Sequence, residues 1–563
     1  MDAPAIKTAP PATEFVENDN VATVNAFKKG KLEVTILSRA RARALAGRLC
    51  ELEIINTERP QKILCRINRV DMTNAIHASE EFQQAIADSG SLPYYSGDCD
   101  ILTATVELIA CLDGQSGQFS SIVCPPQSGT LLRVLHTDEV QDYMAEKQYY
   151  AYVGYMPDEP GMYMAISNRN FGTYSDENGN DLGGYGEAKH QLICGQNGSG
   201  KTVLALTNIA CQLAAHPNLG CLIPDTAGDI SRGGSHSKGD FRFNFIELLQ
   251  ARGRSPRYIK IEDVRLTSKT SFRQLLAPVL RKSSLSMNAE KSEILAERVA
   301  EDLFERDEVT LDDLSEERLF DSIIEQVGGV YTGRTRTEKQ ESAEELRSNP
   351  ALRRAFLRRY QDRVLKFFQG GHSIDELVKA FLKNGQIILL NMAVMSQDDQ
   401  HYVMYEIFSK VRRRAEQRFK AYGETQNGLI VLDEGPRWAP ERGTDDVTKV
   451  IKDAFNTTRK LGVGWTIITQ RLTAIAKDIV AQCHTKFIGK GMGIGADRDN
   501  MRAILGDDGL VVYDQLSLRG GFFWLVSGHQ VNYGVGEQYM AFETFGGNAT
   551  QAIVKANPHI WRD

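Results

Sequence analysis

The stretch GQNGSGKT, residues 195–202, decides the fold because it matches the GxxxxGK[ST] pattern of a phosphate-binding loop. In this pattern glycines let backbone N–H groups approach the phosphates, the lysine contacts the β- and γ-phosphates, and the hydroxyl binds Mg²⁺. An apolar run, QLIC at 191–194, precedes the loop, and a helix-forming run, VLALTNIACQLAA, follows it. Strand, loop and helix in this order predict a P-loop that binds ATP and Mg²⁺. The expected nucleotide contacts are Gly195, Asn197, Gly198, Ser199, Gly200, Lys201, Thr202 and Val203, with Thr202 also on the metal.

Strand candidates alternate with helical segments from residue 191 onward. These strands are near-continuous apolar runs, which is typical of a parallel sheet covered on both faces. The sequence therefore predicts an α/β fold around the P-loop. The candidate strands are 191–194, 220–224, 257–261, 386–392, 428–433, 464–469, 485–490 and 522–526.

An acidic pair follows the apolar run at 428–433. A P-loop needs one carboxylate to hold Mg²⁺ through water and another to polarise the attacking water, both at the end of a neighbouring buried strand. We expect Asp433 to be the metal-side acid and Glu434 the general base. The alternative is an acidic turn after a core strand.

Three more polar positions are candidate catalytic residues. Gln470 follows the strand at 464–469 and can position water, although a plain surface glutamine fits the spacing too. Arg459 ends the helix before that strand. It is a candidate for a charge supplied to a neighbouring subunit's γ-phosphate, or else an ordinary helix C-terminal cation. Asp229, in the acidic segment PDTAGD, either assists water activation or shapes a turn.

The net charge of −7 gives the chain no overall attraction for nucleic acid or anionic lipid. Any polyanion site must then be a local patch. The loop at 231–242 combines glycines with Arg232, Lys238 and Arg242, and is a candidate pore loop that touches phosphates.

Cysteine spacing and hydropathy indicate the cellular compartment in which the protein is expected. The nine cysteines form no CxxC pair, which predicts reduced thiols without disulfides or structural zinc. No apolar run approaches the ~18 residues that span a bilayer, so we expect a soluble, cytoplasmic protein that does not bind membranes.

The rest of the chain divides by composition. Short β-branched runs predict a small N-terminal barrel or sandwich, and a segment rich in Glu, Arg, Leu and Lys predicts amphipathic helices. The arginine pairs 353–354 and 358–359 are interpreted as a solvated helix face. The expected divisions are a flexible leader (1–20), a β-barrel domain (21–150), a linker (151–190), a first segment of the ATPase core (191–269), a helical insertion (270–380), a second segment of the ATPase core (381–545) and a C-terminal tail (546–563).

Taken together, these motifs resemble the HerA branch of the HerA/FtsK ATPases. DTAGD (225–229) resembles that family's DPHGE, and LDEGPRWAP (432–440) resembles its DEAHRFAP. TRKLGVGWTIITQR (458–471) is similar to its arginine-lysine segment followed by strand-SQR, and AQCHTKFIGK (481–490) is similar to SQCNTKIIFR.

The resemblance implies a RecA-like core in a ring, most often a hexamer, with a small barrel before the motor. It implies ATP at subunit boundaries, with Lys201, Thr202, Asp433 and Glu434 on one side and Arg459 reaching across. It also implies DNA in the ring pore and a nuclease or other effector partner, which we expect to dock on the barrel.

Two positions depart from the family pattern. Asp229 stands where the family has Glu, which draws its carboxylate back by one methylene, and Gly435-Pro436 replaces Ala-His after the acidic pair. ATP binding is therefore a firmer expectation than fast hydrolysis.

The main hypothesis is an ATP-driven DNA translocase or helicase that works in DNA end processing or anti-phage defence. The rival hypothesis is a scaffold ring, held by ATP, that docks and activates an effector with little translocation. A third, a secretion or conjugation ATPase, is disfavoured because no transmembrane segment is expected and the first 150 residues resemble a barrel.

Overall fold

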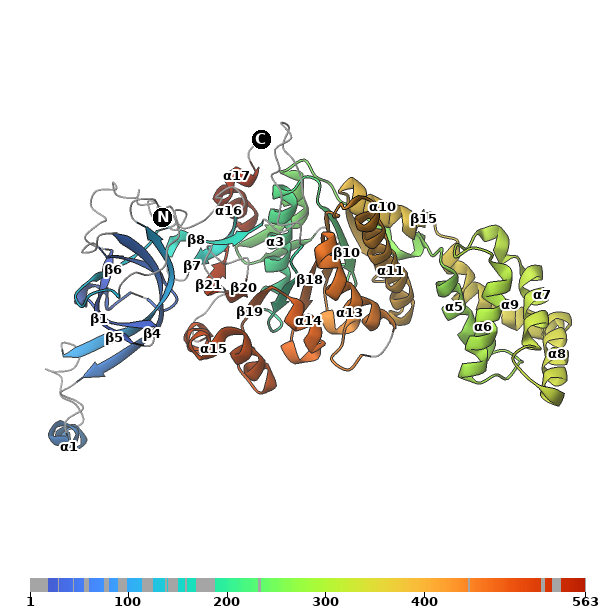
Figure 1. Ribbon diagram of the computed structural model, residues 1–563, viewed down its shortest axis with the longest axis horizontal. Helices are drawn as coiled ribbons and strands as arrows, with labels where there is room; N and C mark the ends of the chain where they lie inside the picture. Colours follow the sequence, from blue (N-terminus) through green and yellow to red (C-terminus); the bar gives the residue numbers. More distant parts are fainter. Residues whose placement is uncertain are drawn as a thin grey trace.

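The computed structural model describes most of the chain. Of the expected leader (1–20), only positions 19 and 20 lie among the described residues. Figure 1 shows an elongated molecule with a barrel at one end, an α/β core in the middle and a separate group of helices at the other end. The described residues are 19–28, 30–43, 45–54, 60–74, 80–89, 99–113, 125–136, 139, 150–156, 159–168, 188–230, 234–443, 446–517, 522–528 and 538–561.

The core is built on an eleven-stranded sheet. The first seven strands in its spatial order are parallel, as the near-continuous apolar runs predicted, and the remaining pairs are antiparallel. The order is β13 (Arg257–Lys260), β16 (Ile387–Asn391), β10 (Gly220–Asp225), β17 (Gly428–Leu432), β18 (Val463–Thr469), β9 (Gln191–Cys194), β19 (Thr485–Gly489), β20 (Phe523–Gly528), β21 (Gln538–Thr544), β7 (Tyr150–Met156) and β8 (Glu159–Ser167).

Three sequence-based expectations differ from this sheet. The strand expected at 522–526 is antiparallel to β19, not parallel, because β20 begins beside the end of β19, after α15 (Ala496–Ser517), and runs back along it. The expected linker (151–190) contains most of β7 and all of β8, which extend the sheet as a hairpin. The expected tail (546–563) contains α16 (Ala549–Ala556) and α17 (Pro558–Trp561), whose apolar side chains are buried.

Successive residues of the parallel strands alternate between two buried faces. Ile430 and Leu432 of β17 belong to one apolar cluster, while Leu429 and Val431 belong to the other. On the second face lies α3 (Lys201–Ala215), and on the first lie α11 (Gln397–Tyr422) and α13 (Asp446–Thr458). This explains why β17 lacks a polar alternate position: neither of its faces is open to water.

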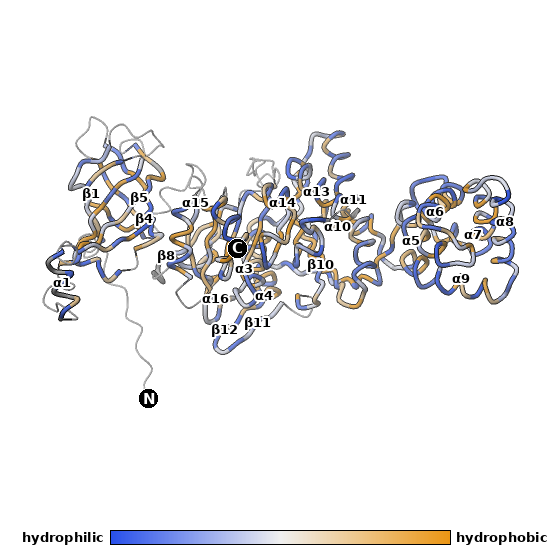
Figure 2. Tube along the Cα trace, turned by 90° about the horizontal axis from the view of Figure 1, so that it is seen from below, coloured by the Kyte–Doolittle hydropathy of each residue, from blue (hydrophilic) through white to orange (hydrophobic). Residues whose placement is uncertain are grey.

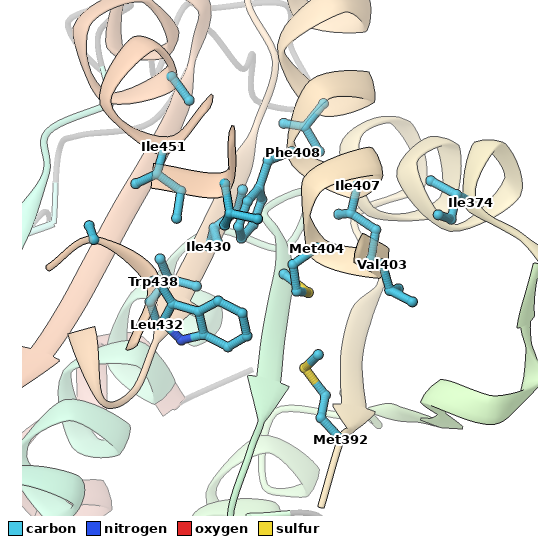
Figure 3. Packing of buried hydrophobic residues seen from close by; sticks show 14 of the residues in the cluster. Ile374, Met392, Val403, Met404, Ile407, Phe408, Ile430, Leu432, Trp438 and Ile451 are labelled. Atoms are coloured by element: carbon cyan, nitrogen blue, oxygen red, sulfur yellow. The ribbon is translucent and has the colours of Figure 1, made fainter. Parts of the chain in front are cut away.

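Beneath the acidic pair, the first face is closed by large side chains. Figure 3 shows Trp438 beside Leu432, with Met404 of α11 across from them. Trp438 is fully buried, and its indole N–H donates to the Asp433 carbonyl oxygen at 3.0 Å. The core packing thus holds the backbone at the end of β17.

The N-terminal domain is a closed six-stranded barrel, which confirms the barrel prediction. Its apolar interior is separate from the two core clusters. Arg66 joins it to the core: the buried guanidinium lies 3.5 Å from the ring centroid of Tyr539 and donates to that residue's carbonyl oxygen. In spatial order the strands are β1 (Asn20–Lys28), β2 (Lys31–Ile36), β5 (Asp100–Asp113), β4 (Gln61–Asn74), β3 (Leu49–Ile54) and β6 (Leu131–Val134).

The helical insertion lies between β13 and β16. At its base two short parallel strands pair, β14 (Val264–Arg265) and β15 (His372–Ser373), so the chain leaves and re-enters the core at one place. Asp399, in the first turn of α11, accepts from Lys366 at 3.0 Å and ties the insertion to the core. The helices are α5 (Lys269–Arg281), α6 (Ala289–Leu303), α7 (Glu316–Val327), α8 (Gly333–Ser348) and α9 (Pro350–Arg363).

Helix ends follow local chemistry. Ser373 and Glu376 form a reciprocal capping box at the start of α10 (Ile374–Asn384), which satisfies two N–H groups of the first turn.

No helix among the described residues combines the length and apolar character required to cross a membrane.

We predict that Gly462→Ala destabilises the protein far more than Gly423→Ala. Both glycines have positive φ, +79° and +69°, which costs an alanine about 1 kcal/mol. A Cβ at Gly423 meets nothing within 4 Å, whereas at Gly462 it would lie 1.9 Å from the Gln426 carbonyl oxygen, so the starts of β17 and β18 must separate. We expect a loss above about 3 kcal/mol at Gly462, seen as a lower thermal midpoint; equal midpoints for the two variants would contradict this.

Candidate nucleotide-binding site

The P-loop connects β9 to α3 at the carboxyl edge of the parallel strands. Gly198 and Gly200 have left-handed φ values of +79° and +84°, which favour glycine. Backbone hydrogen bonds fix the loop to both neighbouring strands: Gly195 N–H donates to the Thr469 oxygen (3.2 Å) and Gln196 N–H to the Lys490 oxygen (2.9 Å).

A cavity of about 690 Å³ opens in front of the P-loop. Six of the eight predicted nucleotide contacts line it, whereas Gly195 and Ser199 are buried behind the loop. Among the other cavity residues are Asp433, Glu434, Gln470 and Asp229. The six P-loop residues are Asn197, Gly198, Gly200, Lys201, Thr202 and Val203.

The P-loop fits a phosphate ligand. The Ser199 hydroxyl is buried without a hydrogen-bond partner, and a Cβ at Gly195 would lie 2.7 Å from it, so the loop accepts no larger residue there. Lys201 donates to the Gln196 carbonyl oxygen of the same loop at 2.9 Å. Burial lowers the pKa of Lys201, while the negative charge of Asp433 opposes that shift. The Gln196 carbonyl oxygen is a neutral acceptor for the Lys201 ammonium group. A bound phosphate would be a negatively charged acceptor and would interact with it more strongly.

The acidic pair does not lie on the strand next to the P-loop, contrary to the expectation of a neighbouring strand. β18 separates β17 from β9. Two strand spacings of about 4.8 Å place the acids about 10 Å from the P-loop strand. That gap leaves room for a terminal phosphate and a water molecule between the acids and the P-loop.

Asp433 is partly buried at the end of β17. Burial raises the pKa of its carboxyl group. The hydrogen bond from the Glu434 N–H (2.8 Å) and the charge of Lys201 oppose this shift, whereas the charges of Glu434 and Asp225 add to it. A cation in the cavity would stabilise the ionised form, so Asp433 and the Thr202 hydroxyl are suitable ligands for Mg²⁺.

Glu434 has a strained backbone. Its φ of +51° is one of two positive values among the described non-glycine residues, and a left-handed glutamate is unfavourable unless its surroundings impose it. The side chain is exposed to the cavity, with its carboxylate 3.9 Å from Arg437. This conformation turns Glu434 out of the strand direction and into the cavity.

The departure after the acidic pair, Gly435-Pro436, fits the local packing. Gly435 is buried where a Cβ would lie 2.6 Å from Ile467 and 2.7 Å from Ile475, so no alanine fits without movement. Pro436 lies in the first turn of the short helix α12 (Gly435–Trp438), where a missing N–H costs nothing. The substitutions therefore suit the local packing and leave the acids in the cavity.

Three basic residues that line the cavity were not among the predicted site residues: His236, Arg437 and Arg471. Arg437 follows Glu434 at helical spacing, a signal that was available. It donates to Gln400 of α11, and its carbonyl oxygen lies 3.1 Å from His401 Nε2. Arg471, exposed beside Gln470, pairs with the buried Asp497 at 3.1 Å, a contact that no local pattern indicates.

Asp225 and Asp229 have different positions. Asp225 accepts from the Gly228 N–H at 2.8 Å, so its carboxylate shapes the turn after β10. Asp229 lines the cavity near His236. Of the two acids, Asp229 is the one with access to a bound nucleotide.

Arg459 does not approach the cavity of its own chain. It lies before β18, whose seven residues span about 20 Å to the opposite edge of the sheet. There its guanidinium lies 2.5 Å from His484 Nε2. Any contact with a phosphate must involve the cavity of another subunit, so its role stays a prediction.

We predict that Asp433→Asn stabilises the nucleotide-free protein at pH 8. With the folded-state pKa raised, ionised Asp433 carries a burial penalty that is complete above that pKa and vanishes below about 4, where the unfolded carboxyl is also protonated. The gain in thermal midpoint should therefore shrink as the pH falls. Asp507→Asn, at an 87% exposed side chain, is the matched control and should change the midpoint little; a lower midpoint for Asp433→Asn at pH 8 would refute the burial penalty.

Comparison with known proteins gives one partial family match and several distant structural likenesses. The family model described as Zonular occludens toxin (Zot) matches residues 331–504, under a third of the chain and outside the P-loop. No curated protein has significant sequence similarity to the chain.

Three solved structures illustrate the likeness. The genome-packaging NTPase B204 of Sulfolobus turreted icosahedral virus 2, in complex with ATP-gammaS, is 10% identical with a TM-score of 0.28, covering 62% of this chain and 96% of B204. The bacterial conjugative coupling protein TrwBdeltaN70 is 11% identical with a TM-score of 0.36, covering 73% and 85%. VirB4 of Thermoanaerobacter pseudethanolicus is 12% identical with a TM-score of 0.37, covering 71% and 98%.

Identities and TM-scores this low carry no argument about function, so the assignment depends on the chain itself. One strand separates the P-loop strand from the acidic strand, and both deliver their side chains into one cavity. The chain is therefore a P-loop protein with an α/β core, in which the P-loop and the acidic pair face the same cavity.

Proposed function

We propose that the protein is a ring-forming, ATP-driven DNA translocase, most simply a hexamer, that hydrolyses ATP between subunits. The position of Arg459, about 20 Å from its own cavity, supports a shared site because only a neighbouring subunit can present this arginine to the γ-phosphate. In this proposal Lys201 binds the phosphates, Thr202 and Asp433 hold Mg²⁺, Glu434 is the general base, and Gln470 and Asp229 position water.

The observation that carries the DNA interaction is the hairpin β11 (Ser235–Lys238) and β12 (Phe241–Asn244). His236 of β11 lines the nucleotide cavity, whereas Lys238 and Arg242 are exposed near the turn. Figure 2 shows the hairpin at the edge of the core beside α4 (Phe245–Gln250) and α16. The hairpin thus contacts the nucleotide cavity at one end and presents two cations near its turn. Such cations could bind the phosphates of the DNA backbone.

A scaffold ring is the second candidate. The barrel has its own core, separate from those of the ATPase sheet, and suits a docking domain for a nuclease or other effector. DNA end processing, anti-phage defence and a cytoplasmic location belong to the same proposal.

We predict that DNA stimulates ATP turnover and that Lys238→Ala/Arg242→Ala lowers the stimulated increment and the affinity for DNA. If each cation contacts one phosphate, the slope of log K against log salt falls by about two. The matched control is Arg334→Ala/Lys420→Ala, which removes two exposed cations that lie on the helices α8 and α11, away from the hairpin. DNA affinity that is equal in the two double variants would refute the hairpin as the DNA contact.

We predict that Glu434→Gln lowers turnover by about 10²- to 10⁴-fold, because it removes the general base but keeps the phosphate contacts. Native mass measurement with ATP should still detect the ring. If the variant ring activated the effector as well as the parent protein does, the scaffold role would replace the motor role. If no ring formed with or without ATP in either protein, the shared-site proposal would fail.

A further inference from the structure

The phosphate end of the cavity has a definite direction. In the proposed site, Lys201 and Asp433 line the part of the cavity at the ends of β18 and β17, which is where the terminal phosphates would bind. A nucleoside triphosphate is too long for its base to remain there. The base must therefore extend past Thr202 and Val203, toward the side of β9 that carries β19 and β20.

On that side an aromatic ring lies directly against the P-loop. Phe522 precedes β20, and atoms of its ring lie 3.4 and 3.7 Å from the position that a Cβ on Gly200 would take. Gly200 lines the cavity, so the ring lies next to a cavity residue although Phe522 is not itself among the lining residues. The direction of β20 explains this placement: an antiparallel strand begins at the carboxyl edge, where the P-loop lies.

The ring is fixed at its backbone but open on its side chain. The Phe522 carbonyl oxygen accepts from the Thr544 N–H at 3.2 Å, which ties the residue to β21. Its side chain is nevertheless 48% exposed, although apolar clusters are available on both faces of the sheet. An aromatic ring that lies beside a phosphate-binding loop and is partly exposed to solvent can stack on a planar base.

From this arrangement we propose that Phe522 is the platform on which the base of the bound nucleotide stacks. The ligand chemistry is a purine ring carried by a triphosphate in the P-loop. The inference deepens the nucleotide-binding proposal and rests on it, but does not depend on DNA translocation.

The test compares two ligands, ATP and inorganic tripolyphosphate, by titration calorimetry on the full chain. Phe522→Ala should weaken ATP by about 5- to 150-fold, the usual range for loss of one base–aromatic stack, and leave tripolyphosphate unchanged. Phe522→Trp should retain ATP affinity within about threefold. Phe419→Ala, at another exposed phenylalanine (43%), is the matched control and should affect neither ligand.

Two outcomes would overturn the proposal. Unchanged ATP affinity in Phe522→Ala would show that the base lies elsewhere. An equal loss for both ligands would show that the ring only supports the P-loop, and tripolyphosphate binding also reports that the loop is folded. Lys201→Ala separates this from a failure of the nucleotide site: it should weaken both ligands, and if it weakens neither, the phosphate assignment itself is wrong.

Discussion

The parallel register of β17, β18 and β9 is the constraint on which the rest of the molecule depends. Thr469 pairs with Cys194, and Leu432 pairs with Ile467. Because all three strands end at one edge, the residues that follow them meet there without further guidance. A slip of one residue in either pairing would invert the faces of a strand and withdraw its polar end from the cavity.

The register is maintained by burial on both faces and by close backbone contacts. The apolar clusters above and below the sheet leave no polar alternate position on β17 that would favour another alignment. Strain is then tolerated locally, at Glu434, because the indole N–H of Trp438 holds the preceding carbonyl. The packing of the sheet thus compensates for the unfavourable backbone conformation of Glu434, the acid that faces the cavity.

The parallel strands, the barrel and the α/β class could be predicted because they follow from local patterns. Continuous apolar runs indicate strands, and the P-loop needs only eight consecutive residues. The direction of β20 and the pairing of β7 with β21 could not be predicted, because both depend on contacts between strands far apart in sequence. The spacing of Asp433 from the P-loop likewise depends on which strand lies between, a property of topology that no motif records.

The same distinction applies to side chains in the cavity. Lys201, Thr202 and Asp433 belong to motifs whose chemistry is written in consecutive residues. Arg471 is held by Asp497, and Phe522 lies against Gly200 only because an antiparallel strand starts there. These contacts join segments tens to hundreds of residues apart and appear only once the sheet is assembled.

The paired strands β14 and β15 have a consequence for how such a chain can change. They bring the two ends of a segment of about one hundred residues to adjacent backbones, Val264 opposite His372. The ends of the helical insertion therefore stay at the same distance from each other in the core, whatever the length of the insertion. The helical insertion can therefore change in length or in surface charge without changing the geometry of the core sheet.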